Sequence, residues 1–192
     1  MRYYILLFVF LILSSINAQE KYASFKQPSG NVVDIQIDTD KLQIYFPLHY
    51  SGDSGIILEN EKSRLAFLDF LNSSFDKFEE WEKTAKENNV KDFDKDIASK
   101  RLGDTHYFKY GSWQFKWGKS NIYTKMTISE EGTAYFYVIT PSYASSSNDY
   151  IESDLGILQL DKEGILKIND ALSTDTINNI KSKEEDLDSL FN

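Results

Sequence analysis

Two residue types that carry much of protein chemistry are scarce in this chain. Among its 192 residues there is no cysteine, and there are only two histidines. A chain without cysteine has no thiolate nucleophile, no disulfide framework and no Cys-ligated zinc. Two histidines leave little for a transition metal, and the nine glycines are scattered over predicted turns instead of forming a phosphate-binding loop. We therefore expect no cofactor and no metal centre.

Positive charge is scarce as well. The chain has 21 Lys and Arg against 30 Asp and Glu, which gives a formal net charge of −9. Affinity for phosphate backbones comes from clustered Lys and Arg, so we exclude nucleic acid as a partner. The length is that of one domain with a sizeable core.

Long apolar runs are confined to the N-terminus, where residues 5–13 read "ILLFVFLIL". With Arg2 before it and Ala18 shortly after it, this run is typical of a secretory signal peptide and is too short to cross a bilayer. We expect cleavage after Ala18 and an exported chain, periplasmic or secreted, with no membrane span in the mature protein. The alternative is an uncleaved anchor. Loss of Arg2 makes the mature chain one charge unit more acidic.

Hydrophobic periodicity predicts the first elements. Residues 31–38 and 42–46 alternate apolar and polar side chains on either side of a turn at 38–41, which predicts a hairpin. The short apolar strand "GIIL" follows, and Asn60 is a good N-cap for an amphipathic helix over about 61–88. The predicted apolar stripe of this helix comprises Leu65, Leu68, Leu71, Phe75, Phe78, Trp81 and Ala85.

Turn residues between 105 and 140 predict a four-stranded meander. Gly111-Ser112 and Lys119-Ser120 suit two-residue hairpins, and Glu130-Glu131-Gly132 suits a three-residue turn. The register given by these turns pairs Tyr110 with Trp113, Gly118 with Asn121 and Ser129 with Thr133. It places one set of residues on the core face: His106, Phe108, Tyr110, Trp113, Phe115, Trp117, Ile122, Met126, Ile128, Ala134, Phe136 and Val138.

The predicted fold class is α+β. An antiparallel sheet, made of the N-terminal hairpin and the four-stranded meander, carries the long helix on its aromatic face, and a short C-terminal helix covers 161–172. The predicted organisation is a signal peptide over 1–18, an irregular lead-in over 19–30, one domain over 31–172 and a polar tail over 173–192. The tail composition fits either a helix or a frayed end.

The tetrapeptide Gly52-Asp53-Ser54-Gly55 raises the question of a serine hydrolase. A serine nucleophile needs a base that is itself held in place. A trypsin-like protease requires a histidine far upstream of the serine, and here no histidine precedes His49. A GDS-type esterase requires an Asp-x-x-His motif downstream, and the nearest approximation, Asp104-Thr105-His106, is one residue too short. Because Gly, Asp and Ser are also turn residues, we interpret the tetrapeptide as a turn.

The segment "DFDKD" resembles the start of a calcium loop, with Asp92, Asp94 and Asp96 as candidate ligands. An EF-hand requires glycine at the sixth position and glutamate at the twelfth, and here these are Ile97 and Gly103. An EF-hand is excluded. A looser calcium site stays open beside the simpler interpretation, an acidic cap before a short helical turn.

The other face of the predicted meander is rich in tyrosine and lysine. Tyrosine offers flat apolar area with a polar tip at low entropic cost, and lysine attracts anionic groups. The competing interpretation is a solvated face whose lysines lie over the tyrosine rings. The predicted ligand-binding residues are Tyr107, Lys109, Gln114, Lys116, Tyr123, Lys125, Tyr135 and Tyr137.

Residues 63–97 carry one resemblance to known proteins. "SRLAFLDFL" and "KFEEWEKTAKENNVKDFDKDI" resemble a pattern of uncharacterised small secreted proteins of Bacteroidota-type bacteria. The resemblance implies a bacterial, exported, single-domain protein. It carries no assigned activity, so it implies no functional residues.

These features favour an exported, non-enzymatic binding domain for an unknown protein, peptide or glycan. Two alternatives stay open. One is a carboxylate-based hydrolase acting on envelope or polysaccharide material, although 30 acidic residues single out no catalytic pair. The other is an inhibitor or immunity-type protein whose acidic surface meets a basic partner, which the net charge permits without requiring.

Overall fold

The computed structural model describes residues 21–38, 41–47, 53–58, 60–102, 106–110, 113–117, 120–140, 144–145, 148–152 and 156–189. The fold is α+β with antiparallel sheets, a long helix and a shorter helix near the C-terminus, as predicted. Its strands are β1 (Lys21–Lys26), β2 (Val32–Asp38), β3 (Lys41–Pro47), β4 (Asp53–Leu58), β5 (Phe93–Leu102), β6 (His106–Tyr110), β7 (Trp113–Trp117), β8 (Ser120–Ile128), β9 (Ala134–Thr140), β10 (Ala144–Ser145), β11 (Asn148–Glu152) and β12 (Gly156–Leu160). Its helices are α2 (Glu61–Glu87), α3 (Lys162–Ala171) and α4 (Thr174–Ser189).

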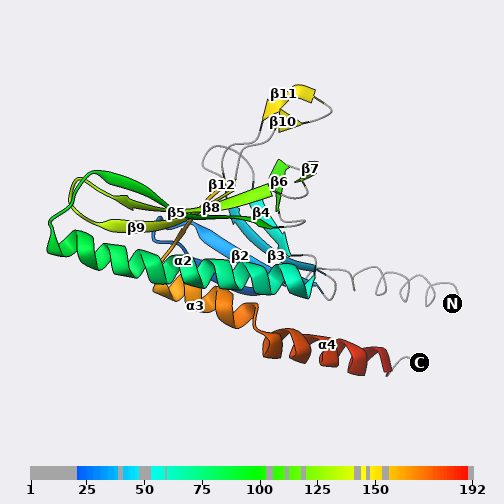
Figure 1. The fold of residues 1–192 in the computed structure, drawn as a ribbon. Coiled ribbons are helices and arrows are strands. Elements are labelled where there is room, and N and C mark those ends of the chain that lie inside the picture. Colours follow the sequence, from blue (N-terminus) through cyan, green and yellow to red (C-terminus); the bar gives the residue numbers. More distant parts are fainter. Residues whose placement is uncertain are drawn as a thin grey trace, which may run out of the picture.

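The long strands form two sheets that share one layer of helices. The larger sheet has the order β1-β2-β3-β4-β6-β7 and the smaller sheet has the order β12-β9-β8-β5, while β10 and β11 form a separate hairpin. Figure 1 shows α2 running along both sheets, with α3 beside it and α4 extending towards the C-terminus. The core therefore lies between the sheets and the layer of α2 and α3.

The predicted four-stranded meander is divided between these two sheets. The pairings predicted on either side of its first and last turns are confirmed, because Tyr110 pairs with Trp113 and the Ser129 amide donates to the Thr133 carbonyl at 2.9 Å. The predicted pairing of the second and third strands of the meander is wrong. Strand β7 stays at the edge of the larger sheet, and β8 pairs with β9 and β5. The physical reason is that β5 pairs with β8 along its full length, which satisfies more backbone groups than the five-residue β7 offers.

Two further segments differ from their predictions. Strand β1 pairs with β2 inside the predicted irregular lead-in, and its Phe25 is buried in the core. Strand β5 occupies residues predicted as a short helical turn. The last predicted element is resolved in favour of a helix, because α4 covers most of the polar tail. Its Ile177 and Ile180 pack against the core.

Helix α2 begins where the sequence predicts, and the predicted stripe faces the core except at Leu65. Leu71, Phe75 and Phe78 are buried, and the remaining members pack against the core: Leu68, Trp81 and Ala85. The Asn60 side chain accepts from the Ser63 amide at 2.9 Å, and the Ser63 hydroxyl in turn accepts from the Asn60 amide at 3.2 Å, so the cap is reciprocal. The predicted stripe begins at Leu65, yet Leu65 is 47% exposed whereas Phe67 is fully buried. The buried residues of the helix are Ser63, Arg64, Phe67, Phe70, Leu71, Ser74, Phe75 and Phe78.

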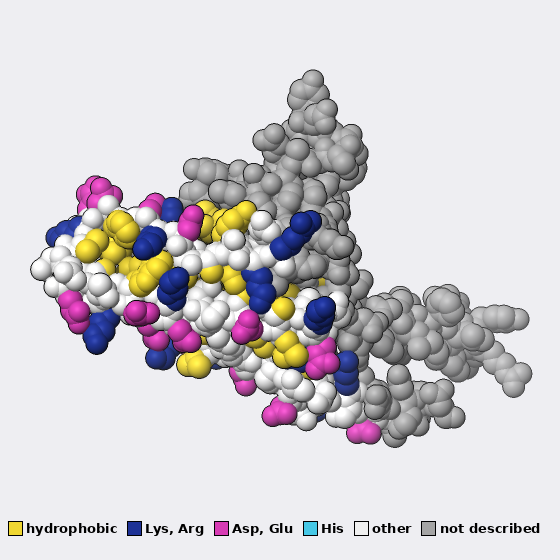
Figure 2. Space-filling view, viewed as in Figure 1, with side chains coloured by type: hydrophobic (Ala, Val, Ile, Leu, Met, Phe, Trp, Pro, Cys, Tyr) yellow, Lys and Arg dark blue, Asp and Glu magenta, His cyan; other side chains and the backbone are white. Residues whose placement is uncertain are grey.

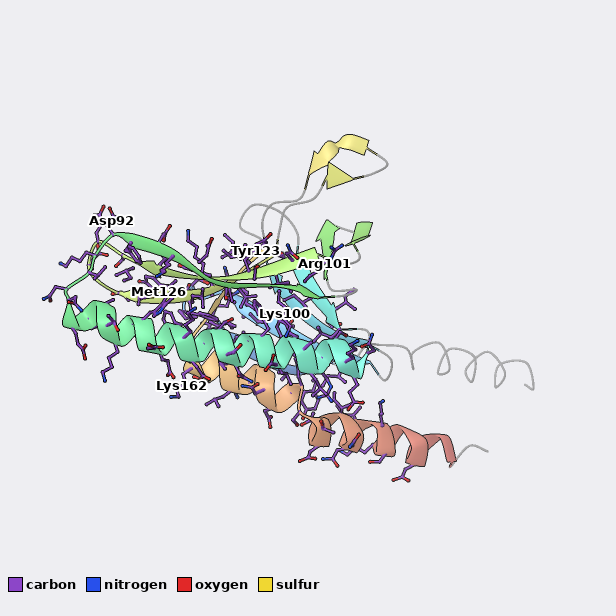
Figure 3. The ribbon with its side chains drawn as sticks, in the orientation of Figure 1. Asp92, Lys100, Arg101, Tyr123, Met126 and Lys162 are labelled. Atoms are coloured by element: carbon purple, nitrogen blue, oxygen red, sulfur yellow. The ribbon has the colours of Figure 1, made fainter. Side chains whose placement is uncertain are left out.

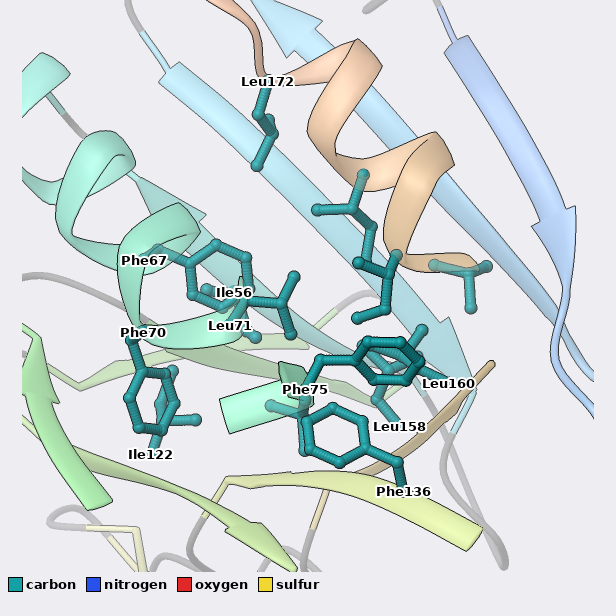
Figure 4. Packing of buried hydrophobic residues seen from close by; sticks show 14 of the residues in the cluster. Ile56, Phe67, Phe70, Leu71, Phe75, Ile122, Phe136, Leu158, Leu160 and Leu172 are labelled. Atoms are coloured by element: carbon teal, nitrogen blue, oxygen red, sulfur yellow. The ribbon is translucent and has the colours of Figure 1, made fainter. Parts of the chain in front are cut away.

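Aromatic contacts join α2 to the smaller sheet. The Phe136 ring on β9 lies 5.3 Å from Phe75 in an edge-on contact and 5.5 Å from Phe78, both favourable geometries. Figure 4 shows Leu158 and Leu160 of β12 beside Phe75 and Phe136, and Ile122 beside Phe70 at the other end of the cluster. One large apolar cluster therefore binds the helix to the β8 and β9 surface.

Helix α3 approaches the larger sheet closely at Gly164. A Cβ atom at this position would lie 3.0 Å from the Phe25 ring and 3.1 Å from the Leu160 side chain, too close for an unshifted contact. Packing therefore favours glycine, because a larger residue would require these side chains to shift by a few tenths of an ångström. Asp161 caps the same turn by accepting from the Gly164 amide at 2.8 Å. This close approach packs α3 against Phe25 of β1 and so holds β1 against the core.

Polar contacts hold the helices to one another. Asn72 on α2 and Asn169 on α3 exchange two amide hydrogen bonds of 2.9 and 2.8 Å. The buried Arg64 guanidinium donates to the Leu172 carbonyl and to the Thr174 hydroxyl at 3.1 Å, which ties α2 to the α3–α4 junction.

Within the described part of the chain, no helix combines the length and apolarity that crossing a bilayer would demand.

The burial of α2 predicts a contrast between two neighbouring residues. Phe67→Ala removes a fully buried ring and lowers the free energy of unfolding by about 3–5 kcal/mol. Leu65→Ala removes a side chain that is half exposed and lowers it by less than about 1 kcal/mol. Urea unfolding of both variants measures the difference; a Leu65→Ala cost as large as that of Phe67→Ala would favour the stripe that begins at Leu65.

Candidate binding surface

The serine of the GDSG tetrapeptide lies in a strand and not in a turn. Strand β4 begins at Asp53, and Ser54 pairs with Phe46 of β3 and with Phe108 of β6. The interpretation of residues 53–55 as a turn is therefore wrong, because the central position of β4 between two strands is stabilised by backbone hydrogen bonds on both edges. The backbone register brings His106 opposite Ile56, and the side chains of Ser54 and His106 lie outside the described part of the structure.

The three aspartates of "DFDKD" do not gather into a metal site. Asp92 adopts a left-handed backbone conformation with φ 48° at the entrance to β5, and Asp94 is paired with Lys125. Among the residues that the structure describes, no group of three His, Asp or Glu side chains is arranged to hold a metal ion. The predicted acidic cap before a helical turn is replaced by the ten-residue strand β5.

The predicted tyrosine and lysine face is likewise split into two parts. Tyr107 pairs with Lys116, and Lys109 pairs with Gln114, as predicted, but these residues lie on β6 and β7 of the larger sheet and their side chains are outside the described part. Tyr123, Lys125, Tyr135 and Tyr137 lie on β8 and β9 of the smaller sheet. The two parts are not joined through β7 and β8.

The second part lies on what we call the outer face, the side of the smaller sheet that points away from α2. Figure 3 shows Tyr123 on this side of the sheet and Met126 between the sheet and α2, consistent with the complete burial of Met126. Strand pairing gives the outer face three rows. They are Asp94, Thr127 and Tyr135; then Asp96, Lys125, Tyr137 and Gln159; then Ser99, Tyr123, Ile139 and Ile157.

An ion pair on the outer face joins the edge strand β5 to its neighbour β8. The Lys125 ammonium lies 2.7 Å from a carboxylate oxygen of Asp94. The Lys125 ammonium first, and then the Thr127 hydroxyl, donate to this carboxylate and hold the pKa of Asp94 below its ordinary value. Lys125 is therefore already neutralised by its own sheet, which the sequence did not indicate because it placed β7 and not β5 beside β8.

Apolar and aromatic side chains lie beside this ion pair. Tyr123 is 37% exposed and Ile157 is 47% exposed, and they lie on either side of Ile139 in one row. The rings of Tyr135 and Tyr137 have their centroids 6.3 Å apart. Burial, followed by the proximity of Tyr135 and Asp94, raises the pKa of the Tyr137 phenol above its ordinary value, so this tyrosine is neutral at physiological pH.

The lysines on the opposite side of β5 are engaged by α2. The Lys95 ammonium lies 4.1 Å from the centre of the Trp81 ring, and the Lys100 ammonium lies 3.2 Å from Asp69. Both contacts help to hold the edge strand onto the helix. The outer face is thus chemically distinct from the helix-facing side of the same strand.

Several outer-face residues were missed at the sequence level for different reasons. Thr127 and Ile139 share the predicted β8–β9 register and come directly from it. Asp94, Asp96 and Ser99 can be assigned to the outer face only if β5 is predicted as a strand. Polar residues occupy both faces of β5, so its sequence shows no alternation of apolar and polar side chains. The assignment of Ile157 to the outer face requires the pairing of β12 with β9. No short turn connects these two strands, so no turn signal predicts the pairing.

No family model matches the chain, and searches of curated proteins and of solved structures found no similar protein. Any functional assignment therefore depends on the chemistry of the outer face itself.

The ion pair between Asp94 and Lys125 predicts a specific titration effect. Lys125→Met removes the main cause of the lowered pKa of Asp94 and moves that pKa upwards towards its ordinary value. Carboxyl NMR titration of Asp94 measures the change. Lys95→Met is the matched control, because Lys95 adjoins Asp94 in sequence but contacts Trp81 on the other side of β5; an equal shift in both variants would contradict the assignment.

Proposed function

We propose that the protein is an exported binding domain and that the outer face of the smaller sheet is its ligand-binding surface. The single observation that carries this proposal is the arrangement around Lys125: partly exposed tyrosines and isoleucine lie beside charged groups that already neutralise one another. Rigid aromatic surface with a few fixed polar groups is typical of recognition sites. Export comes from the expected signal peptide.

The position of Lys125 supports binding over a merely solvated face. A solvated face of this composition would lay its lysine across the tyrosine rings and so cover them. Lys125 instead contacts Asp94. Within the described residues, the lysines that lie over an aromatic ring are Lys77 and Lys95, and both lie over Trp81 on the other side of the sheet. No lysine in the described part of the chain therefore lies over the outer-face tyrosines.

The carboxylates of the outer face also suit binding better than hydrolysis. A general acid in a carboxylate-based hydrolase needs a raised pKa, so that the group is protonated at working pH. The pKa of Asp94 is lowered, which keeps its carboxylate ionised and able only to accept hydrogen bonds. With its pKa lowered in this way, Asp94 suits positioning a ligand better than protonating one.

Tyr123→Ser tests the proposal. Tyr123 is partly exposed, so the variant keeps the fold, which thermal unfolding verifies, while it removes aromatic contact area. We expect at least a roughly fivefold loss of affinity for any ligand that the wild-type protein binds, which corresponds to about 1 kcal/mol. Calorimetric titration or affinity electrophoresis measures the loss.

Tyr22→Ser is the matched control for this experiment. Tyr22 is also an exposed tyrosine, but it lies on β1 of the larger sheet. The control is expected to bind as the wild type does. Ligands that bind the wild type and Tyr123→Ser equally would place the binding surface elsewhere on the molecule.

A further inference from the structure

We propose that the ligand of the outer face is an uncharged carbohydrate chain; this inference rests on the binding function proposed above. The charges of the face decide against strongly charged ligands. The face carries two carboxylates, Asp94 and Asp96, and two cationic side chains. These are Lys125, which contacts Asp94, and Arg101, which pairs with Asn121 further along β5, so the face has no excess of either sign. An anionic or a cationic partner meets no excess of opposite charge here, although the chain as a whole carries −9.

The surrounding surface supports the same conclusion. On the side of the molecule that carries α2, Figure 2 shows Lys and Arg side chains interspersed with Asp and Glu, with hydrophobic patches between them and no broad area of one sign. Long-range attraction of a charged polymer requires a field of one sign. An uncharged ligand depends instead on local contacts, and the outer face provides those.

The polar groups of the ion pair match the hydroxyl groups of a sugar. A sugar hydroxyl both donates and accepts a hydrogen bond, so neighbouring hydroxyls can donate to the Asp94 carboxylate and accept from the Lys125 ammonium. The Asp94 side chain is 55% exposed and that of Lys125 is 30% exposed, so both groups keep accessible surface. Their 2.7 Å pairing fixes them beforehand, which lowers the entropic cost of binding.

The tyrosines match the other surface of a sugar. Carbohydrate C–H groups carry partial positive charge because of the neighbouring oxygens, and an aromatic face is electron-rich. Tyr123 lies one row from the Asp94–Lys125 pair, and Tyr135 and Tyr137 lie on the neighbouring strand. A ligand can therefore contact rings and polar groups together, which uncharged apolar compounds cannot do.

The backbone of the sheet disfavours an extended peptide as the ligand. Peptides that bind sheets usually add a strand to a free edge and gain main-chain hydrogen bonds. Strands β8 and β9, which carry the outer-face tyrosines, each have a neighbour on both sides. A peptide strand could therefore add only at the edge strands β5 and β12, and not over the tyrosines. The width also suits a chain of sugars, because four adjacent strands span about 14 Å at roughly 4.8 Å per spacing.

Affinity electrophoresis of the full-length mature protein tests this inference. The gels contain a neutral soluble polysaccharide (β-glucan, galactomannan or xyloglucan) or the anionic polymer polygalacturonate, and a pool of uncharged peptides is titrated separately. We expect retardation by at least one neutral polysaccharide, a roughly fivefold or greater loss in Tyr123→Ser and in Lys125→Met, and no loss in Tyr22→Ser. Affinity should change by less than about twofold between roughly 0.05 and 0.5 M salt, since screening acts on net charge.

Each other outcome decides the question differently. Binding of polygalacturonate alone, with a steep fall in salt, or of peptides alone, would overturn the carbohydrate inference; if Tyr123→Ser still weakened that binding, the outer face would remain the binding surface. Binding of a neutral polysaccharide that Tyr123→Ser leaves unchanged would overturn both the inference and the proposed surface. Absence of binding to all of these probes would overturn the carbohydrate inference.

Discussion

The pairing of β5 with β8 is the contact on which the rest of the arrangement depends. It extends from Phe93 opposite Ile128 to Leu102 opposite Ser120, and it occupies the edge of β8 that β7 would otherwise take. The same pairing turns Lys95 and Lys100 towards α2 and Asp94 towards Lys125. One strand thereby closes the core on one side and sets the chemistry of the surface on the other.

Local signals in the sequence were sufficient for the elements that depend on local contacts. Asn60 and Asp161 cap α2 and α3 as predicted, and the tight turns fixed the registers of β6 with β7 and of β8 with β9. Strand β5 gave no such signal, because charged residues occupy both of its faces and are satisfied by partners distant in sequence. Its place in the sheet comes from backbone pairing with β8, to which the ion pairs and the Trp81 contact add. Hydrophobic periodicity reports none of these contacts.

The same distinction explains why half of the predicted surface is found together. Tyr123, Lys125, Tyr135 and Tyr137 were placed by one short hairpin, and the structure keeps them on one face. The other four residues were predicted to join this face through pairing of β7 with β8, and β5 takes the place of β7 beside β8. They are Tyr107, Lys109, Gln114 and Lys116. On α2, Leu65 was misplaced for a related reason: several apolar faces were available, and the fit of Phe67 and Phe70 against the sheets selected one.

The exchange of neighbours around β8 also changes the chemistry of the surface and not only its outline. With β7 beside it, Lys125 would have lain in a row with Lys109 and would have favoured an anionic partner. With β5 beside it, Lys125 is matched by Asp94, and the surface becomes neutral and able to donate and accept hydrogen bonds at one point. Tyr123, Tyr135 and Tyr137 are present in both arrangements. The neighbouring strand therefore decides whether Lys125 is free to attract an anionic group or is matched by Asp94, and the second arrangement suits an uncharged, hydroxyl-rich chain.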